Sequence, residues 1–249
     1  MQAHPILQSE IPEAQRAAAA LRLPSMQPVA AGALLTVDDA FATQLAEKAR
    51  LIAADRGRVI AVLPGAEAAL DELLGSVVAA LAARPDFAVE RDLVRRPDDV
   101  TVALDRADPL LTLSQLAQED FCILQKQGEE HVLTAALLCF PAAWTLSEKI
   151  GRPLTGIHVP VAPYTDDIAR RVQRLFDGVQ PGRPVWRANL LRYDDFALFQ
   201  PYTEAQRRKV GAPDSPFERS ERQTVFRLPE CGAVVFAIHS TVIRRAVAG

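Results

Sequence analysis

The chain has 249 residues, of which 49% are hydrophobic and 24% are charged, and its formal net charge is -3. This length and apolar content suffice for the buried core of one or two domains, and they exclude a fibrous or broadly disordered chain. The slightly acidic charge offers no field for nucleic acid, and no window approaches the roughly 18 apolar residues of a membrane span. We therefore expect a globular protein without a nucleic-acid or membrane partner.

The chain start and the cysteines predict a reducing compartment. Residues Met1 to Glu10 lack the basic start and apolar run of a signal peptide, which predicts a cytoplasmic location. The three cysteines, Cys122, Cys139 and Cys231, show no close pairing in sequence. We expect reduced, mostly buried thiols rather than disulfides or a metal cluster.

The N-terminal third predicts an arm followed by two helices. Residues 1–36 mix Gln, Pro and Ala without a sustained period, and no catalytic group is expected there. Asp38 or Asp39 can cap a helix with apolar residues at helical spacing, and a second amphipathic helix spans Leu70 to Leu81. The segment Arg84 to Pro109, rich in Arg, Asp and Pro, predicts a connection into the second half.

Short elements alternate in the second half of the chain. Two apolar runs, Phe121 to Gln125 and His131 to Phe140, predict a hairpin, and Thr145 to Glu148 has the pattern of a capping box before a short helix. A third amphipathic helix is predicted from Tyr164 to Phe176. Three strands follow, at 185–193, 223–228 and 233–242. This element order predicts an α+β fold that is PAS-like: an antiparallel sheet with crossover helices holds a cofactor, here with N-terminal helices added.

One block sets a single histidine, His158, between two predicted helices. Pro153, Pro160 and Pro163 restrict the backbone around it, so we expect a stiff loop that displays the imidazole. No companion ligands with zinc or calcium spacing are present, and a lone histidine suits haem, whose porphyrin supplies four further nitrogens. The alternatives are a buried imidazole that pins its loop through backbone carbonyls, and Cys139 as a haem thiolate.

The remaining histidines are weaker candidates. His4 falls in the arm, and His131 begins a strand beside two glutamates, where a solvated turn histidine is expected. His239 alternates with apolar residues on the last strand, so it either points at a cofactor or is a satisfied, partly buried side chain.

Two groups of arginines accompany the predicted strands. They suit haem propionates or another acidic ligand; alternatively they are solvated strand charges paired with carboxylates such as Glu221. The groups are Arg183, Arg187 and Arg192, and Arg219 and Arg222. The chain shows no nucleotide-binding glycine motif and no nucleophile elbow, so a redox reaction here would draw its electrons from another polypeptide.

Several motifs, in order from about Val37 to Val242, resemble the haem-dependent oxidative N-demethylase family. They are Gln118-Glu-Asp120, Cys139-Phe-Pro-x-x-Trp144, Glu148-Lys-Ile-Gly-Arg-Pro-Leu154, Ile157-His-x-Pro-Val161, Pro181-Gly-Arg-Pro-Val-Trp-Arg-x-Asn189, and Glu221-Arg-Gln-Thr224 with Arg227-Leu-Pro229. The resemblance implies a PAS-like domain at 37–245 that binds haem b. It also implies oxygen-dependent oxidation of a small secondary amine, such as dimethylamine, to a primary amine and formaldehyde. Electrons would come from an external flavin or iron-sulfur reductase.

The resemblance also implies roles for particular residues. His158 is expected as the axial ligand of the haem iron. Arg187 and Arg222 are expected at the propionates or on the oxygen side, and Arg222 thereby also among the catalytic residues. Glu221 or Tyr164 is expected to hold the substrate ammonium, through charge or cation-π attraction, so both are catalytic candidates.

Two positions depart from the family pattern. Leu190 stands where the family commonly has Trp, and His239 lies in Ile-His-Ser-Thr where the family has Ile-Arg-Thr-Tyr. These departures leave the substrate open and make His239 a candidate second haem contact. The alternatives are therefore a non-catalytic haem-binding PAS sensor and a cofactor-free interaction domain. The sequence does not determine the reductase or whether the chain forms a homo-oligomer.

Overall fold

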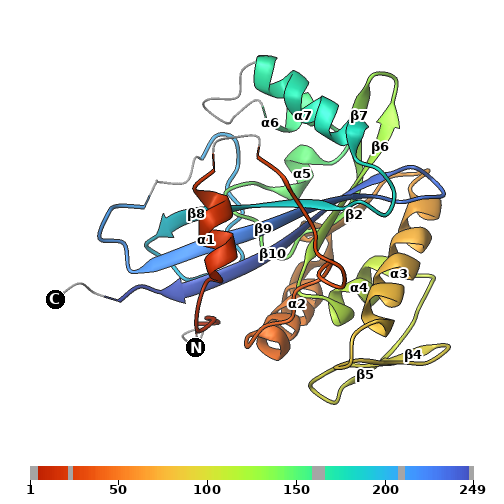
Figure 1. The fold of residues 1–249 in the computed structure, drawn as a ribbon, viewed down its shortest axis with the longest axis horizontal. Helices are drawn as coiled ribbons and strands as arrows, with labels where there is room; N and C mark the ends of the chain where they lie inside the picture. The colour runs from red at the N-terminus through yellow and green to blue at the C-terminus, as the bar shows by residue number, and fades with distance from the viewer. Residues whose placement is uncertain (1–4, 22–24, 159–165, 207–210, 247–249) are drawn as a thin grey trace.

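The computed structural model describes residues 5–21, 25–158, 166–206 and 211–246, except for the side chains of residues 158 and 166–169. Its main element is a seven-stranded antiparallel sheet in the order β1-β8-β9-β10-β6-β7-β2, shown in Figure 1. A second, three-stranded sheet has the order β3-β4-β5. Helices accompany both sheets, so the described residues confirm the predicted α+β class.

The elements have the following bounds. The large sheet comprises β1 (Gln27–Pro28), β2 (Ile60–Val62), β6 (Asp120–Gln127), β7 (Glu130–Leu137), β8 (Val185–Tyr193), β9 (Phe217–Arg227) and β10 (Val234–Arg244). The small sheet comprises β3 (Ala88–Val89), β4 (Leu93–Arg95) and β5 (Thr101–Ala103). The helices of the described residues are α1 (Glu13–Ala19), α2 (Phe41–Asp55), α3 (Glu67–Ala82), α4 (Pro109–Leu116), α5 (Leu146–Lys149), α6 (Leu154–His158) and α7 (Asp166–Gly178).

The five long strands confirm the predicted order of two strands, helices and three strands. β6 and β7 form the first hairpin, α5 to α7 follow, and β8, β9 and β10 complete the sheet. In Figure 1, α5, α6 and α7 lie above the large sheet, whereas α2, α3 and α4 lie below it. We call these two sides of the sheet the α7 face and the α2 face.

The register of β9 and β10 decides which residues reach each face. Glu221 pairs with Ser240, and Arg222 pairs with His239. Side chains alternate along a strand, and antiparallel partners share a face. Val225 of β9 packs with residues of α5 to α7. Gln223 and Glu221, two and four positions earlier, therefore also point to the α7 face. Arg222 and His239 consequently point to the α2 face.

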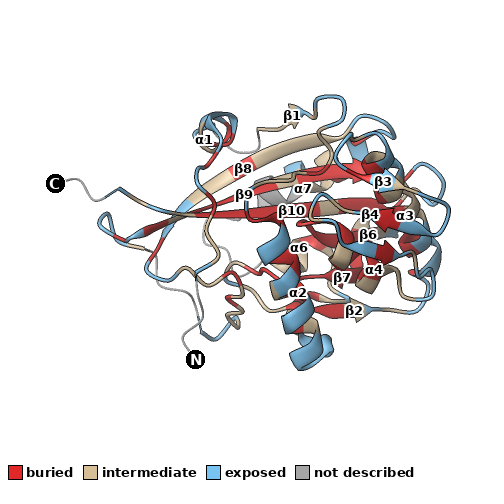
Figure 2. Ribbon diagram, turned by 90° about the horizontal axis from the view of Figure 1, so that it is seen from below, coloured by how far each residue is buried: buried red, intermediate tan, exposed pale blue. Residues whose placement is uncertain are grey.

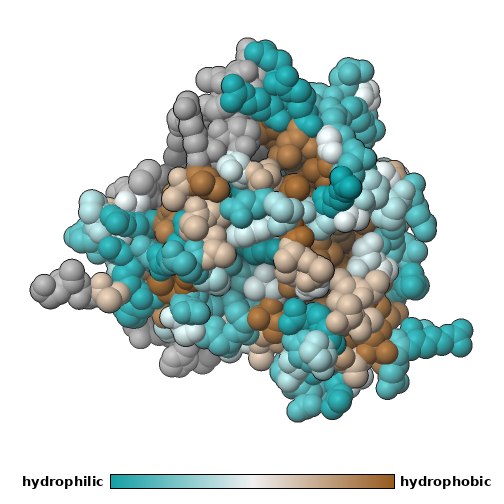
Figure 3. Space-filling view, viewed as in Figure 1, coloured by the Kyte–Doolittle hydropathy of each residue, from teal (hydrophilic) through white to brown (hydrophobic). Residues whose placement is uncertain are grey.

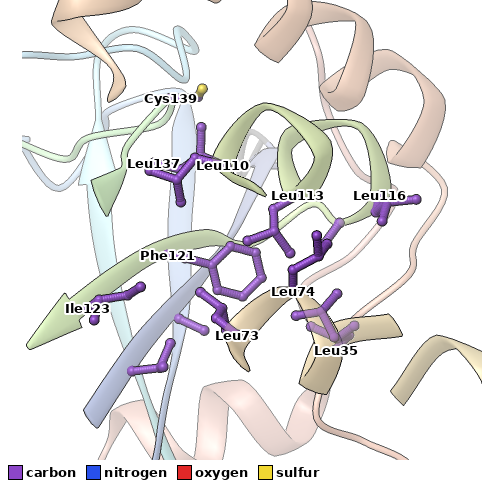
Figure 4. Close-up of a cluster of buried hydrophobic side chains, with 14 of the residues drawn as sticks. Leu35, Leu73, Leu74, Leu110, Leu113, Leu116, Phe121, Ile123, Leu137 and Cys139 are labelled. Carbon is purple, nitrogen blue, oxygen red and sulfur yellow. The ribbon is translucent and has the colours of Figure 1, made fainter. Parts of the chain in front are cut away.

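Leucines and other apolar side chains fill the space under the α2 face. Phe121 and Ile123 of β6 meet Leu73 of α3 and Leu113 of α4, and all four are 0% exposed (Figure 4). Each such side chain contributes about 1.5–3 kcal/mol by leaving water. Figure 2 shows that β10, the central strand, is buried along most of its length, while β8, next to the β1 edge, is partly exposed.

Two sequence expectations about the helix starts are wrong. Ala40 is the N-cap of α2, and Asp38 instead accepts a hydrogen bond from the Ala40 amide in the turn before it, at 3.0 Å. The capping box before α5 does not form. Thr145 Oγ1 donates to the Tyr202 carbonyl at 3.0 Å, and Glu148 accepts from the backbone amide of residue 204. These side chains therefore hold the chain that follows β8, because long-range contacts compete with local capping.

Two segments contain more structure than the sequence indicated. The segment Arg84 to Pro109, predicted as a connection, contains the small sheet of β3, β4 and β5. Within the predicted arm, 1–36, the described residues include α1 and β1, and β1 pairs with β8. Both segments consist of short pieces whose stability comes from packing rather than from a local periodic pattern.

The arm also completes the edge of β10. β6 ends its pairing with β10 at Ile238, so the backbone of Ser240 and Val242 lacks a neighbouring strand on that side. Gln8 bonds the Val242 carbonyl through its backbone amide at 2.9 Å and the Val242 amide through its side chain at 2.9 Å. The side chains of Gln8 and Gln44 both donate to the Ser240 carbonyl, at 3.1 and 2.9 Å.

Candidate functional site

Four polar side chains gather on the α7 face, where the pattern of the sheet would otherwise place apolar ones. Asn189 of β8 pairs with Glu221 of β9, and Arg187 pairs with Gln223. Since antiparallel partners share a face, all four point the same way. Glu221 is buried and the other three are half-buried. We call Arg187, Asn189, Glu221 and Gln223 the polar cluster.

Glu221 is the centre of the polar cluster. Asn189 Nδ2 donates to Glu221 Oε2 at 3.0 Å, Gln223 Nε2 donates to the same oxygen at 3.2 Å, and Asn189 Oδ1 accepts from the Glu221 amide at 2.9 Å. Arg219 Nη2 lies 3.4 Å from Glu221 Oε1. Several donors around one carboxylate compensate the cost of burying its charge and hold it in one orientation.

Arg219 connects Glu221 to three distant parts of the chain. Its side chain is 2% exposed, and it donates to the carbonyls of Leu198 at 2.9 Å and Phe140 at 2.6 Å. It also donates to Ser240 Oγ at 3.2 Å. This guanidinium is thus a structural cation whose two terminal nitrogens are both in use, and it leaves Glu221 fixed against the sheet.

Arg187 differs from Arg219 because it donates no hydrogen bond to any described residue. Burial lowers the pKa of Arg187 from its ordinary value, and the charge of Glu221 opposes that shift. A half-buried guanidinium whose five N–H donors are unused by the described residues is suited to bind an anion.

An apolar strip borders the polar cluster on the same face. Val185 pairs with Val225, Phe236 pairs with Val225 on its other side, and Ile238 pairs with Gln223. These apolar residues belong to the core cluster that includes α5, α6 and α7, and Val185 and Phe236 remain partly exposed. Figure 3 shows apolar side chains at the surface below α7 among otherwise hydrophilic ones. The site can therefore receive a ligand with an apolar body and polar ends.

His158 is the last residue of α6, so the expectation that it lies in a loop is wrong at the backbone. The helix begins directly after Pro153, whose carbonyl accepts from the Ile157 amide at 3.0 Å. Lys149 Nζ donates to the Ile157 carbonyl at 2.8 Å and so anchors the end of this short helix. The side chain of His158 and the whole of Tyr164 lie outside the described residues.

Arg222 points to the α2 face, away from Glu221, so these neighbours in sequence form no ion pair. Its guanidinium donates to the carbonyls of Ala33 at 2.7 Å and Leu34 at 3.4 Å, and it lies 5.2 Å from the centre of the Trp186 ring. Arg222 therefore fastens the N-terminal segment to the sheet, and the structure does not bring it together with the polar cluster.

His239 also points to the α2 face and is 1% exposed. Its Nε2 lies 3.2 Å from Asp38 Oδ2. Burial alone would raise the pKa of Asp38, but the hydrogen bond and charge of His239, with hydrogen bonds from Gln118 and Gln8, lower it to about 2. His239 is thus part of the attachment of the N-terminal segment, with the sheet between it and Glu221.

The two departures from the family pattern share this location. Leu190 pairs with Ser220, whose hydroxyl contacts Gln15 of α1, so Leu190 lies on the same face as His239. Neither residue lies on the face that carries the polar cluster.

Two other sequence candidates are buried elsewhere. His131, expected to be solvated, is 1% exposed because α7 covers it: Gln173 Nε2 contacts His131 Nδ1 at 2.9 Å, and the Phe176 ring centroid lies 5.7 Å from its own. Cys139 belongs to the core that contains α2, α3 and α4, and burial raises the pKa of its thiol. A neutral buried thiol there is a core side chain, not a thiolate ligand.

Asn189 and Gln223 were not predicted from the sequence to be site residues. Both lie two residues from a named candidate, Asn189 after Arg187 and Gln223 after Glu221. That spacing on a strand is the signal that could have identified them, because residues two apart share a face.

Comparison with known families adds one finding. A family model described as haem-dependent oxidative N-demethylase, alpha subunit-like, matches residues 25–246. Within the described ranges, no helix is long and apolar enough to cross a membrane.

Proposed function

Because the chain belongs to the haem-dependent oxidative N-demethylase, alpha subunit-like family, we propose that it binds haem and oxidatively removes a methyl group from a small secondary amine. The single observation that carries this proposal is the family match over 25–246. The strand order β7-β6-β10-β9-β8, with helices between β7 and β8, supports the PAS-like part of the expectation.

The α7 face fits a haem in the kinds of side chain that it presents. The apolar strip can contact a porphyrin, and the guanidinium of Arg187, which has no hydrogen-bond partner among the described residues, can bind a carboxylate group. His158, at the end of α6 beside this face, is the proposed axial ligand. When bound, haem would supply a redox-active iron that activates dioxygen.

Glu221 is the proposed acceptor for the amine. Its carboxylate is already oriented by Asn189, Gln223 and Arg219, so an ammonium N–H can bind without rearrangement of the protein. The surrounding apolar strip excludes water and strengthens this interaction. Tyr164 remains a second proposed contact for the ammonium.

Electrons are proposed to come from a separate polypeptide. The chain has no nucleotide-binding motif, and the family description names an alpha subunit, which implies a partner. A flavin or iron-sulfur reductase has the chemistry to deliver electrons singly to an iron centre.

The sensor alternative depended on His239 as a second haem contact. The position of His239 on the α2 face, beside Asp38, argues against that contact and so favours the catalytic proposal over the sensor.

The proposal is tested by the absorption spectrum of the purified chain after addition of haem. We expect a Soret band that shifts or disappears in His158→Ala and returns when imidazole is added. His239→Ala is the matched control and should keep the wild-type band. An unchanged spectrum and haem occupancy in His158→Ala would refute the ligand assignment, and a wild-type chain that takes up no haem would refute the function.

A further inference from the structure

The described charges around Glu221 do not suit a bare ammonium ion. Arg219 and Arg187 both lie on the face that carries Glu221, and they contribute two positive charges against one negative charge. Arg219 already neutralises the carboxylate, so Arg187 is the surplus cation. A ligand with only a positive charge would be attracted by Glu221 and repelled by Arg187.

Arg187 is unusual among the buried or half-buried arginines of β8 and β9. Arg219 and Arg222 each donate to two backbone carbonyls, and Arg227 donates to the carbonyls of Val179, Gly232 and Phe176 at 2.6–2.7 Å. Leaving a guanidinium partly desolvated without a partner is costly, because its charge and its N–H groups both lose water. The described residues supply no anion for Arg187, so its guanidinium is open to the anionic group of a ligand.

The planar donor fork of arginine matches a carboxylate, which it binds through two parallel N–H bonds. Arg187 and Glu221 are diagonal neighbours, because Arg187 pairs with Gln223 and Glu221 pairs with Asn189. Diagonal Cβ atoms lie roughly 7 Å apart, within reach of long side chains. No ion pair joins the two among the described residues, so a small molecule with an ammonium and a carboxylate can lie between them.

We propose that the substrate carries a carboxylate next to its amine: an N-methyl α-amino acid, held by Arg187 at the carboxylate and by Glu221 at the ammonium. This inference rests on the proposed function and names its substrate class. The balanced reaction joins R–NH–CH3, O2, two electrons and two protons to give R–NH2, formaldehyde and water. One oxygen atom enters a methyl C–H bond, the C–N bond of the resulting carbinolamine breaks, and the reductase supplies both electrons.

The same guanidinium could take a carboxylate from a haem propionate, and the experiment separates these two sources. Calorimetric titration of the haem-loaded protein without reductant measures binding of N-methylglycine and of dimethylamine. We expect N-methylglycine to bind at least about tenfold more tightly than dimethylamine. Arg187→Gln should lose at least about that factor for N-methylglycine and should not weaken dimethylamine binding, because it removes the charge that repels the dimethylammonium ion.

Two variants complete the design. Glu221→Gln should weaken the binding of both amines, whereas Arg183→Gln, an exposed arginine just before β8, should change neither. Haem titration followed by the Soret band should give the same haem affinity in Arg187→Gln and wild type. Reduced haem affinity with unchanged N-methylglycine binding would assign Arg187 to a propionate and overturn the proposal.

Equal affinities for the two amines would also overturn it. The two proposals fail in different measurements. If the proposed function is wrong, the protein shows no haem spectrum. If only this inference is wrong, the Soret band is intact and the calorimetry shows no preference for N-methylglycine over dimethylamine.

Discussion

Adjacent residues of β9 serve different purposes because a strand alternates its faces. Glu221 points into the polar cluster, whereas Arg222 bonds the carbonyls of the N-terminal segment. Arg219, two residues before Glu221, shares its face and positions its carboxylate. A motif such as Glu-Arg-Gln-Thr thus combines residues of the candidate site with a residue of the scaffold.

Asp38 gives the clearest prediction about a single residue. Its pKa is lowered from 3.8 to about 2, so the folded state holds the proton less tightly than the unfolded state. This contribution to stability is present above the unfolded pKa and is lost as the pH falls through the folded pKa. The shift of roughly 2 pKa units corresponds to about 2 kcal/mol of unfolding free energy.

Urea unfolding of wild type and Asp38→Asn at about pH 6 and about pH 2.5 measures this contribution. The stability difference between the two proteins should shrink by about 1.5 kcal/mol at the acidic pH, because a pH of about 2.5 lies between the folded and the unfolded pKa and part of the contribution remains there. A difference that stays constant across this range would show that Asp38 is not held ionised by its partners.

At the scale of elements, the N-terminal segment acts as an additional partner of β10. Gln8 of this segment and Gln44 of α2 both donate to the Ser240 carbonyl, which β6 leaves unpaired. Gln118 accepts from the Asp38 amide at 3.0 Å, and Glu119 accepts from the Thr36 amide. The Gln-Glu-Asp motif therefore contributes to this attachment rather than to a binding site.

Replacing Gln8 tests the attachment of the arm. Gln8→Ala removes the side-chain bonds to Ser240, Val242 and Asp38, and it should lower the unfolding free energy by about 1–3 kcal/mol. Hydrogen exchange should accelerate at the Val242 amide, which loses its acceptor. Gln180→Ala, whose exposed side chain bonds only the Gly178 carbonyl among described residues, is the control. Unchanged exchange at Val242 would contradict the role of Gln8.

At the scale of the whole molecule, the two faces of the large sheet differ: an apolar core covers the α2 face, and the α7 face carries the polar cluster. Leucines of α3 and α4 seal the α2 face, and α5, α6 and α7 cover part of the other. The large apolar core supports the sheet from one side, so polar groups can be tolerated on the other without loss of the fold. Most of the apolar core that supports the fold and the proposed ligand-binding residues thus lie on separate faces.

This separation predicts the outcome of a core substitution. Leu73→Ala removes a side chain that is 0% exposed and should lower the unfolding free energy by about 2–5 kcal/mol. The haem spectrum of the folded variant should remain that of wild type, since Leu73 lies on the α2 face. Leu93→Ala, at a position 40% exposed, should change the unfolding free energy by less than about 1 kcal/mol. A shifted Soret band in Leu73→Ala would contradict the separation.

Local patterns predicted the long elements well. The strand at 185–193 is β8, and the apolar spacing from Tyr164 to Phe176 corresponds to α7, which spans Asp166–Gly178. The small sheet within 84–109 was missed because strands of two or three residues carry no usable period. The capping box failed because Thr145 and Glu148 bond residues more than 50 positions away.

The sequence by itself determined the α+β element order and the family, because periodicity and ordered motifs are properties of short segments. Only the tertiary structure decided which candidates share a site. His239 and Arg222 lie across the sheet from Glu221 and Arg187, since one step along a strand reverses the face. Which face is sealed depends on contacts such as Arg222 with Ala33, 189 residues apart in the chain, and no local pattern contains that information.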